Sequence, residues 1–153
     1  MTPRLHPTLL AILCLLSVGL VLGACSDDGT GPAELQPLVG TWQATELTLT
    51  NLANPDTSVD LIEQGATFTL SILATGQYSA SLVIFGQPSQ EVGSVSVSGN
   101  QITIAPNGGS STTGTWILQG NTVIVDGDTE FDFNVDGIPE AATVHMELIR
   151  IDS

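Results

Sequence analysis

Basic side chains are almost absent from this 153-residue chain. It has no lysine, and its two arginines, Arg4 and Arg150, face sixteen aspartates and glutamates, so the formal net charge is -14 at pH 7. Binding to nucleic acid phosphates requires clustered lysine and arginine, and docking onto anionic lipid depends on the same residues. The charge therefore excludes nucleic acid and anionic lipid surfaces as partners. Cations, basic proteins and neutral small molecules remain as possible partners.

Cysteine is also scarce. The two cysteines are Cys14 and Cys25, and none follows in residues 26–153. That region can form no internal disulfide and offers no thiolate to a metal ion. Its stability has to come from packing and from backbone hydrogen bonds.

Catalytic signatures are missing as well. His145 is the only histidine after residue 25, and the sequence has no phosphate-binding glycine loop. The stretch from Gly93 to Gly99 has the alternation of a strand and not the strand, turn and helix of a nucleophile elbow. We expect His145 to be a surface residue on a strand. We assign no catalytic residues and do not expect an enzyme.

The front of the chain has the organisation of a secretory signal. Arg4 precedes an apolar run over residues 9–22, which is shorter than the roughly 20 residues of a transmembrane helix. The run ends in Leu22-Gly23-Ala24-Cys25, which resembles a bacterial lipobox. The resemblance implies that residues 1–24 are a lipoprotein signal peptide and that Cys25 carries lipid. The alternatives are an ordinary signal cleaved after Gly23 or Ala24 and an uncleaved anchor.

Lipidation would fix where the protein works. Each buried methylene contributes ~0.8 kcal/mol, and stable anchoring takes two acyl chains or more. By the same resemblance, Ser26 implies sorting to the outer membrane. We therefore expect a monomer in the bacterial cell envelope, anchored through lipid and facing the periplasm or the cell surface. Residues 25–37, rich in glycine and proline, are expected to form a flexible linker to one domain over residues 38–153.

From residue 38 onward, apolar and polar side chains alternate with the period of β-strands. The pattern predicts eight strands at residues 41–51, 66–74, 77–85, 91–98, 101–105, 112–119, 122–135 and 141–151. Short connections make this an antiparallel meander, and closing it removes aggregation-prone edges. We predict an all-β fold, an eight-stranded antiparallel up-and-down barrel, with an open sandwich as the alternative. Residues 61–64, in the longest connection, are a candidate for a short helical turn or lid.

Two hairpins of this meander repeat each other. Residues 93–104 match residues 114–125, and each copy runs from glycine through a strand and a Gly-Asn turn into a second strand. Glycine supplies the positive φ that two-residue hairpin turns need. With only two copies, we interpret the match as repeated hairpin chemistry and not as a repeat fold.

A Gly40-Thr41-Trp42 motif opens the first predicted strand. At the start of an eight-strand meander it resembles the lipocalins, and more closely the bacterial lipocalin-like domains found on lipoproteins. The resemblance implies that Trp42 packs across the closed end of the barrel beneath a basic residue from the last strand. Arg150 shares the inward parity of Met146 and Leu148, so it is the predicted partner of Trp42.

The interior of such a barrel is either filled or holds one small ligand. We expect a small apolar ligand, with a filled barrel acting as a protein-interaction or inhibitor-type lipoprotein as the alternative. Glu46 has two possible placements: inside the barrel as a ligand contact, or outside if a bulge near Thr45 changes the parity. The predicted ligand-lining residues are Phe68, Leu70, Tyr78, Leu82, Ile84, Phe131, Phe133, Val144 and Met146.

Acidic residues crowd the last predicted hairpin. The run Asp132-Phe133-Asn134-Val135-Asp136-Gly137 matches the start of a calcium-binding loop, whose hard oxygen ligands follow this spacing. A weak calcium site would use Asp132, Asn134, Asp136 and Glu140, although Thr143 stands where the bidentate glutamate belongs. In the alternative interpretation, Phe131, Phe133 and Val135 point into the core and Asp136-Gly137 is an ordinary hairpin turn. No other cofactor is expected.

Overall fold

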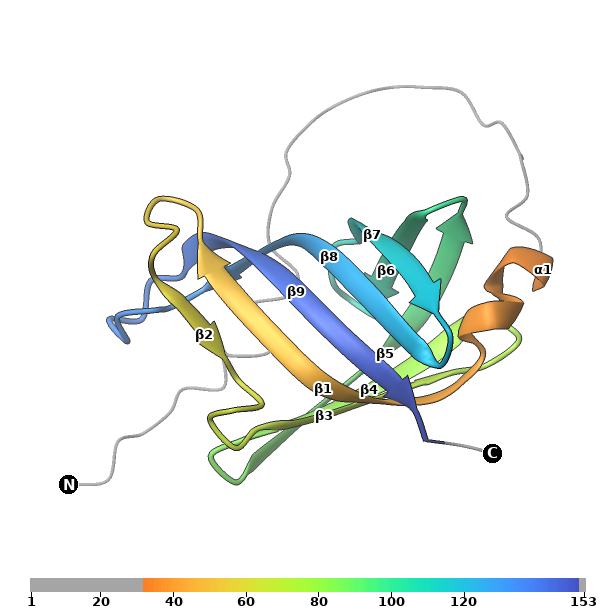
Figure 1. The fold of residues 1–153 in the computed structure, drawn as a ribbon, viewed down its shortest axis with the longest axis horizontal. Coiled ribbons are helices and arrows are strands. Elements are labelled where there is room, and N and C mark those ends of the chain that lie inside the picture. The colour runs from red at the N-terminus through yellow and green to blue at the C-terminus, as the bar shows by residue number, and fades with distance from the viewer. Residues whose placement is uncertain (1–31, 152–153) are drawn as a thin grey trace.

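The computed structural model describes residues 32–151, which form two short helical segments followed by strands (Figure 1). Helix α1 (Pro32–Leu35) runs into the 3-10 helix η2 (Gln36–Leu38). The strands are β1 (Gly40–Asn51), β2 (Ser58–Asp60), β3 (Thr67–Ile72), β4 (Gln77–Ile84), β5 (Gln87–Ser98), β6 (Gln101–Pro106), β7 (Thr112–Gln119), β8 (Thr122–Phe131) and β9 (Glu140–Arg150). No helix in this part of the chain is long and apolar enough to cross a membrane.

The strands close into a barrel. Each strand from β3 to β8 pairs antiparallel with the next, β1 pairs with β3, and β9 pairs back onto β1. The short strand β2 continues along the edge of β1 beyond β3, because residues 48–50 of β1 pair with β2. The predicted eight-stranded antiparallel up-and-down barrel is therefore confirmed, and the open sandwich is wrong.

Several strand boundaries differ from the predictions, by the largest margin at the start of β5 and the end of β8. A turn at Phe85-Gly86 ends β4 one residue early, and β5 begins at Gln87 instead of residue 91. Both turn residues have positive φ, which suits a tight hairpin but is unfavourable for phenylalanine. Strand β8 ends at Phe131 instead of residue 135, because side-chain oxygens of the following acidic residues accept backbone N–H groups and hold a loop.

The first strand contains a bulge that decides which of its side chains face inward. Pairing with β9 shifts by one residue between Ala44 and Glu46, so Thr45 is the extra residue. Before the bulge, Trp42 and Ala44 are buried, and after it Leu47 and Leu49 are buried. The bulge directs Glu46 to the outside, and the alternative of Glu46 as a ligand contact within the barrel is wrong.

The barrel has two different ends. The end where β1 begins and β9 finishes, called the closed end below, also holds the turns of three hairpins, each with a glycine at positive φ. The opposite end, called the open end below, holds the connections after β1, β4, β6 and β8. The larger core cluster fills the closed half with Leu38, Trp42, Ile72, Val97 and Leu148 among its members.

The helical segments belong to the closed end and are part of the folded domain. Leu35 and Leu38 are buried in the core cluster, and the side chain of Leu35 approaches the β3–β4 turn at Gly76. Residues 32–37 were predicted to belong to the flexible linker over residues 25–37. That boundary is wrong, because residues 32–38 are helical and the apolar side chain of Leu35 is buried in the core, where burial of apolar surface stabilises the fold. The predicted lipidation residue Cys25 and the predicted signal segment 1–24 lie outside the described residues.

Candidate functional site

Trp42 and Arg150 meet at the closed end. The guanidinium carbon of Arg150 lies 4.2 Å from the centroid of the Trp42 ring. Its Nη1 donates to the carbonyl of Val39 at 2.6 Å and its Nη2 to the carbonyl of Pro37 at 2.8 Å. The indole Nε1 of Trp42 donates to the carbonyl of Leu38 at 2.8 Å. These contacts tie the helical segment to the last strand and shut this end of the barrel.

The other half of the barrel contains an apolar cavity of about 130 Å³. Leu47 and Leu49 of β1 line it together with Leu82 and Ile84 of β4. Eight of the nine predicted lining residues border the cavity; only Phe133 does not. Phe133 instead packs edge-on against Phe131, with ring centroids 5.0 Å apart.

Further lining residues were not predicted, for two separate reasons. Leu47 and Leu49 face inward only because of the bulge at Thr45. Ser89 lines the cavity because β5 begins earlier than expected, whereas Glu91 is the first residue of the predicted strand 91–98 and was not assigned to the lining. Alternation carried backward from Val95 through Gly93 would have placed both residues on the inner face. The remaining unpredicted lining residues are Leu61, Ala80, Ile102, Ile104, Val125, Thr129, Glu130 and Leu148.

Two carboxylates are the charged groups on the cavity wall. Glu91 accepts a hydrogen bond at 2.6 Å from the phenolic hydroxyl of Tyr78, and Glu130 lies near the end of β8. Among the described residues that line the cavity, none is lysine, arginine or histidine. The wall therefore has no positive charge with which to pair an anionic ligand, and its polar groups suit a neutral molecule or a hydrogen-bond donor.

The cavity mouth lies at the open end. Residues 61–65 form a turn where a short helical turn or lid was predicted over residues 61–64, and the side chain of Leu61 lines the cavity. Asp60 fixes this turn to β1, because its Oδ1 accepts the backbone N–H groups of Ile62 at 2.8 Å and Leu47 at 3.2 Å.

Exposed apolar side chains stand on the loops at the same end. Leu52 is 53% exposed, Phe85 72%, Val135 86% and Ile138 69%. Phe85 and Val135 also have positive φ, which is costly for such residues. The expectation that Val135 points into the core is therefore wrong, since β8 ends before it.

In the loop of the acidic hairpin, backbone N–H groups donate hydrogen bonds to side-chain oxygens of the same loop. The two carboxylate oxygens of Asp132 accept the N–H groups of Asp136 and Gly137 at 3.1 and 2.7 Å. Glu140 accepts from the backbone of Phe133 at 2.9 Å and from the side-chain amide of Asn134 at 2.8 Å. The four residues predicted for calcium do lie in one loop, but much of their acceptor capacity is already used.

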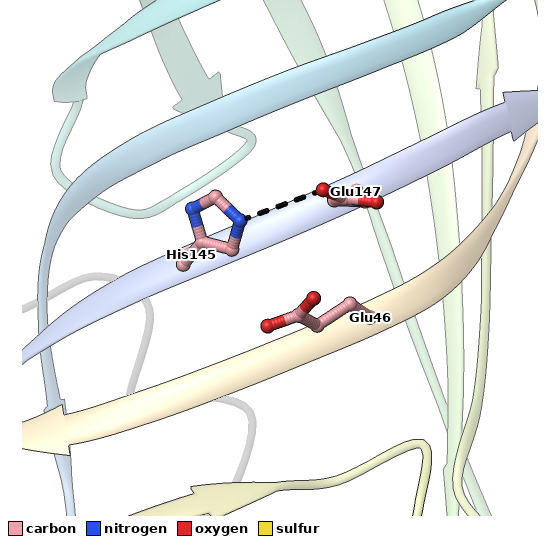
Figure 2. Close-up of side chains that lie close together, drawn as sticks. All are labelled: Glu46, His145 and Glu147. Carbon is pink, nitrogen blue, oxygen red and sulfur yellow. Dashed lines mark ion pairs between the residues drawn. The ribbon is translucent and has the colours of Figure 1, made fainter.

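A second group of polar side chains lies on the outer wall of the barrel. Glu46 from β1 stands beside His145 and Glu147 from β9 (Figure 2). Nδ1 of His145 lies 2.6 Å from a carboxylate oxygen of Asp126 on β8, and Nε2 lies 3.9 Å from a carboxylate oxygen of Glu147. As expected, His145 is on the outer face of a strand.

This arrangement raises the pKa of His145 above its ordinary value of 6.5, chiefly through the hydrogen bond to Asp126. The charges of Asp126, Glu46 and Glu147 act in the same direction, and partial burial opposes them. A raised pKa means that His145 stabilises the fold fully below about pH 6.5, and that this contribution is lost as the pH rises through the folded-state pKa.

Replacing Asp126 with asparagine is expected to lower the pKa of His145 towards 6.5, and to remove most of this pH-dependent stability. Titration of the imidazole resonances by NMR measures the pKa. Asp128→Asn is the matched control, because Asp128 is an exposed acid two residues along the same strand. Equal pKa values for His145 in the two variants would contradict the assignment.

Comparisons with known proteins leave the family open. No protein-family model matches the chain, and no curated protein sequence matches it. Among solved structures, the crystal structure of a rhizavidin–biotin complex aligns with a TM-score of 0.35 and 12% sequence identity, over 71% of this chain and 96% of that chain. The strand pairing and the cavity themselves define the class: a small closed antiparallel β-barrel with an apolar interior pocket at one end.

Proposed function

We propose that this protein is a lipid-anchored protein of the bacterial envelope whose barrel binds a small, neutral apolar molecule. The observation that carries the binding role is the apolar cavity in the open half. Most of its lining side chains are apolar, and an apolar cavity of about this size can take up benzene-sized molecules. The lipobox-like motif ending at Cys25 supports the anchor, and the lipocalin-like Gly40-Thr41-Trp42 motif agrees with a ligand carrier.

Volume and charge narrow the ligand. Pockets for drug-sized ligands measure roughly 300–1,000 Å³, whereas this cavity measures about 130 Å³. A larger ligand would have to extend through the mouth, past the exposed apolar side chains of the open-end loops. A carboxylate head group, as in a fatty acid, would meet Glu91 and Glu130 without a cation to pair with. We therefore favour an uncharged ring or short hydrocarbon over a fatty acid.

Met146 provides an NMR signal that can report on binding in the cavity. Met146 lines it, and the only other methionine in the sequence is Met1. The methyl resonance of Met146, in protein that starts at Ser26 and so retains Leu35, can be followed by NMR during titration. Toluene is expected to shift this resonance saturably, whereas benzoate, its anionic counterpart, is expected to leave it unchanged.

Filling the cavity should abolish toluene binding. Ala80→Leu adds three carbons at a lining position, and the larger side chain would occupy the space that toluene needs. We expect the toluene affinity to fall more than about tenfold, because toluene would lose the burial of carbons that are each worth ~0.8 kcal/mol. Ser79→Leu, on the same strand but exposed, is the matched control and should bind toluene normally. A folded barrel with no saturable shift would contradict the proposed function and favour the filled-barrel interaction protein.

A further inference from the structure

The group on the outer barrel wall contains three side chains that commonly bind metal ions. One ligand atom each from Glu46, His145 and Glu147 lies within 4.8 Å of the other two. Figure 2 shows the two glutamates on neighbouring strands, with the imidazole beside them. The bulge at Thr45 creates this group, because without it Glu46 would point into the barrel.

We propose that Glu46, His145 and Glu147 bind a divalent transition-metal ion of the zinc type on the outer wall of the barrel. Zinc is held by imidazole nitrogen and carboxylate oxygen at about 2.0–2.2 Å, so in a tetrahedral site two of its ligand atoms lie roughly 3.4 Å apart. The Nε2 to Oε1 distance of 3.9 Å between His145 and Glu147 is close to this spacing. Small rotations of the long glutamate side chains bring the remaining ligand atoms together.

Asp126 supports the same assignment from outside the group of three. Its carboxylate lies 2.6 Å from Nδ1 of His145. A proton held on Nδ1 by this carboxylate leaves the lone pair on Nε2, the nitrogen nearest Glu147. Metal-binding histidines almost always donate their second nitrogen to a carboxylate, carbonyl or water in this way, which orients the ring and raises its basicity. Asp126 is therefore a positioning residue.

Glu46 is also held in place. Thr48, two residues further along β1, donates its hydroxyl to Oε1 of Glu46 at 2.8 Å. Strands β1 and β9 carry the two glutamates directly opposite each other, since Glu46 pairs with Glu147 in the sheet. Like charges in that position are destabilising, and a bound cation would remove the repulsion.

Protein cations cannot neutralise this site. Residues 32–151, which the structure describes, contain no lysine and one arginine, Arg150, whose guanidinium lies over Trp42 at the closed end. Three carboxylates, those of Glu46, Asp126 and Glu147, therefore surround a single imidazole. The charge favours an added divalent ion, and the imidazole nitrogen favours zinc-type metals over calcium or magnesium, which prefer oxygen alone.

The site would be open to solvent. Three protein ligands leave at least one coordination position for water. A polar groove of about 520 Å³ borders His145 and Asp126, with Thr113, Thr115 and Asp128 also on its wall. An ion bound here could exchange with the surroundings and contact a small polar molecule in the groove.

Calorimetric titration of the full-length protein in a neutral detergent with zinc chloride tests the proposal. We expect one zinc ion per chain. His145→Asn and Glu147→Gln are each expected to abolish saturable binding, while Asp126→Asn should weaken it about 10–100-fold, as loss of an outer carboxylate partner does. Cobalt(II) provides a second readout, because its visible absorption depends on the atoms that bind it and should change in His145→Asn.

Three controls make the outcome decisive. His6→Asn removes the other histidine of the chain and should leave binding unchanged. Asp132→Asn removes an acid of the hairpin loop and should do the same. Thermal unfolding in the presence of EDTA shows whether each variant is folded. Absence of zinc binding to the folded protein, undiminished binding in folded His145→Asn or Glu147→Gln, or loss of binding in Asp132→Asn would overturn the proposal. None of these outcomes bears on toluene binding in the cavity.

Discussion

Replacing Trp42 with alanine is expected to lower the free energy of unfolding by about 3–5 kcal/mol, the range for removing a large aromatic side chain from a core. Trp42 is among the largest fully buried side chains, and its indole N–H bonds the carbonyl of Leu38. The substitution would therefore leave a cavity and an unpaired acceptor at the closed end. Urea denaturation, monitored by circular dichroism, measures the loss.

Arg150→Ala should also destabilise the fold, and its effect should depend on Trp42. The guanidinium stacks on the indole and bonds two backbone carbonyls before β1. Cation–π contacts contribute ~0.5–1 kcal/mol when exposed and about 2 kcal/mol when desolvated. We expect the double variant to be about 1–2 kcal/mol more stable than the sum of the single effects predicts, because the contact can be lost only once.

Two further variants separate this contact from general damage to β9. Arg150→Lys keeps the charge but loses the planar fork, so it should retain only part of the stability. Ile149→Ala changes the adjacent residue, which is 37% exposed, and its effect should add to that of Trp42→Ala. Strict additivity of Trp42→Ala and Arg150→Ala would mean that the two side chains do not support each other.

Gly93→Ala is expected to destabilise the barrel by about 3 kcal/mol or more, the upper part of the range for overpacking a core. A Cβ atom at residue 93 would lie 2.3 Å from the carbonyl oxygen of Ala105 and 2.8 Å from the Cα of Pro106. Both are backbone atoms of the neighbouring strand, so β5 and β6 would have to separate. Differential scanning calorimetry, together with urea denaturation, measures the effect.

The same substitution should disturb the cavity. The ring of Tyr78 would lie 2.8 Å from the added Cβ, and its hydroxyl donates to Glu91 on the cavity wall. We expect Gly93→Ala to weaken toluene binding as well as stability. Gly99→Ala is the control, because Gly99 has a positive φ but a Cβ added there would meet nothing within 4 Å, so its cost should be about 1–2 kcal/mol. An equal loss in both variants would contradict the steric argument.

Two matching glycines give a physical reason for the sequence match between the two hairpins. Gly114 occupies in the β7–β8 hairpin the place that Gly93 has in the β5–β6 hairpin, and a Cβ there would lie 2.4 Å from the carbonyl of Asp126. Gly93 pairs with Pro106 at the end of the β5–β6 pairing, and Gly114 directly precedes the β7–β8 pairing, which starts at Thr115 and Asp126. The sequence match therefore reflects a shared steric need in two neighbouring hairpins.

Much of the site could be predicted because it depends on local alternation. Phe68, Leu82 and Val144 line the cavity since each sits at an inward position of a regularly alternating strand. The lipocalin resemblance predicted a basic residue over Trp42, and the up-and-down topology, which places the end of the last strand beside the start of the first, identified Arg150 as that residue. Phe133 failed the same rule, because hydrogen bonds from backbone N–H groups to the acidic side chains ended β8 at Phe131.

The sequence by itself determined the eight strands of the barrel, their antiparallel order and the apolar character of its interior, because these follow from period-two patterning and short connections, and it favoured closure over an open sandwich. Only the tertiary structure decided three further features: the bulge at Thr45, the cavity of about 130 Å³, and the meeting of Glu46 with His145 and Glu147. Each of them depends on the register between strands distant in sequence and on how side-chain volume compares with barrel radius. Neither quantity is encoded in a local pattern, so the cavity and the candidate metal site appear only when the chain has folded.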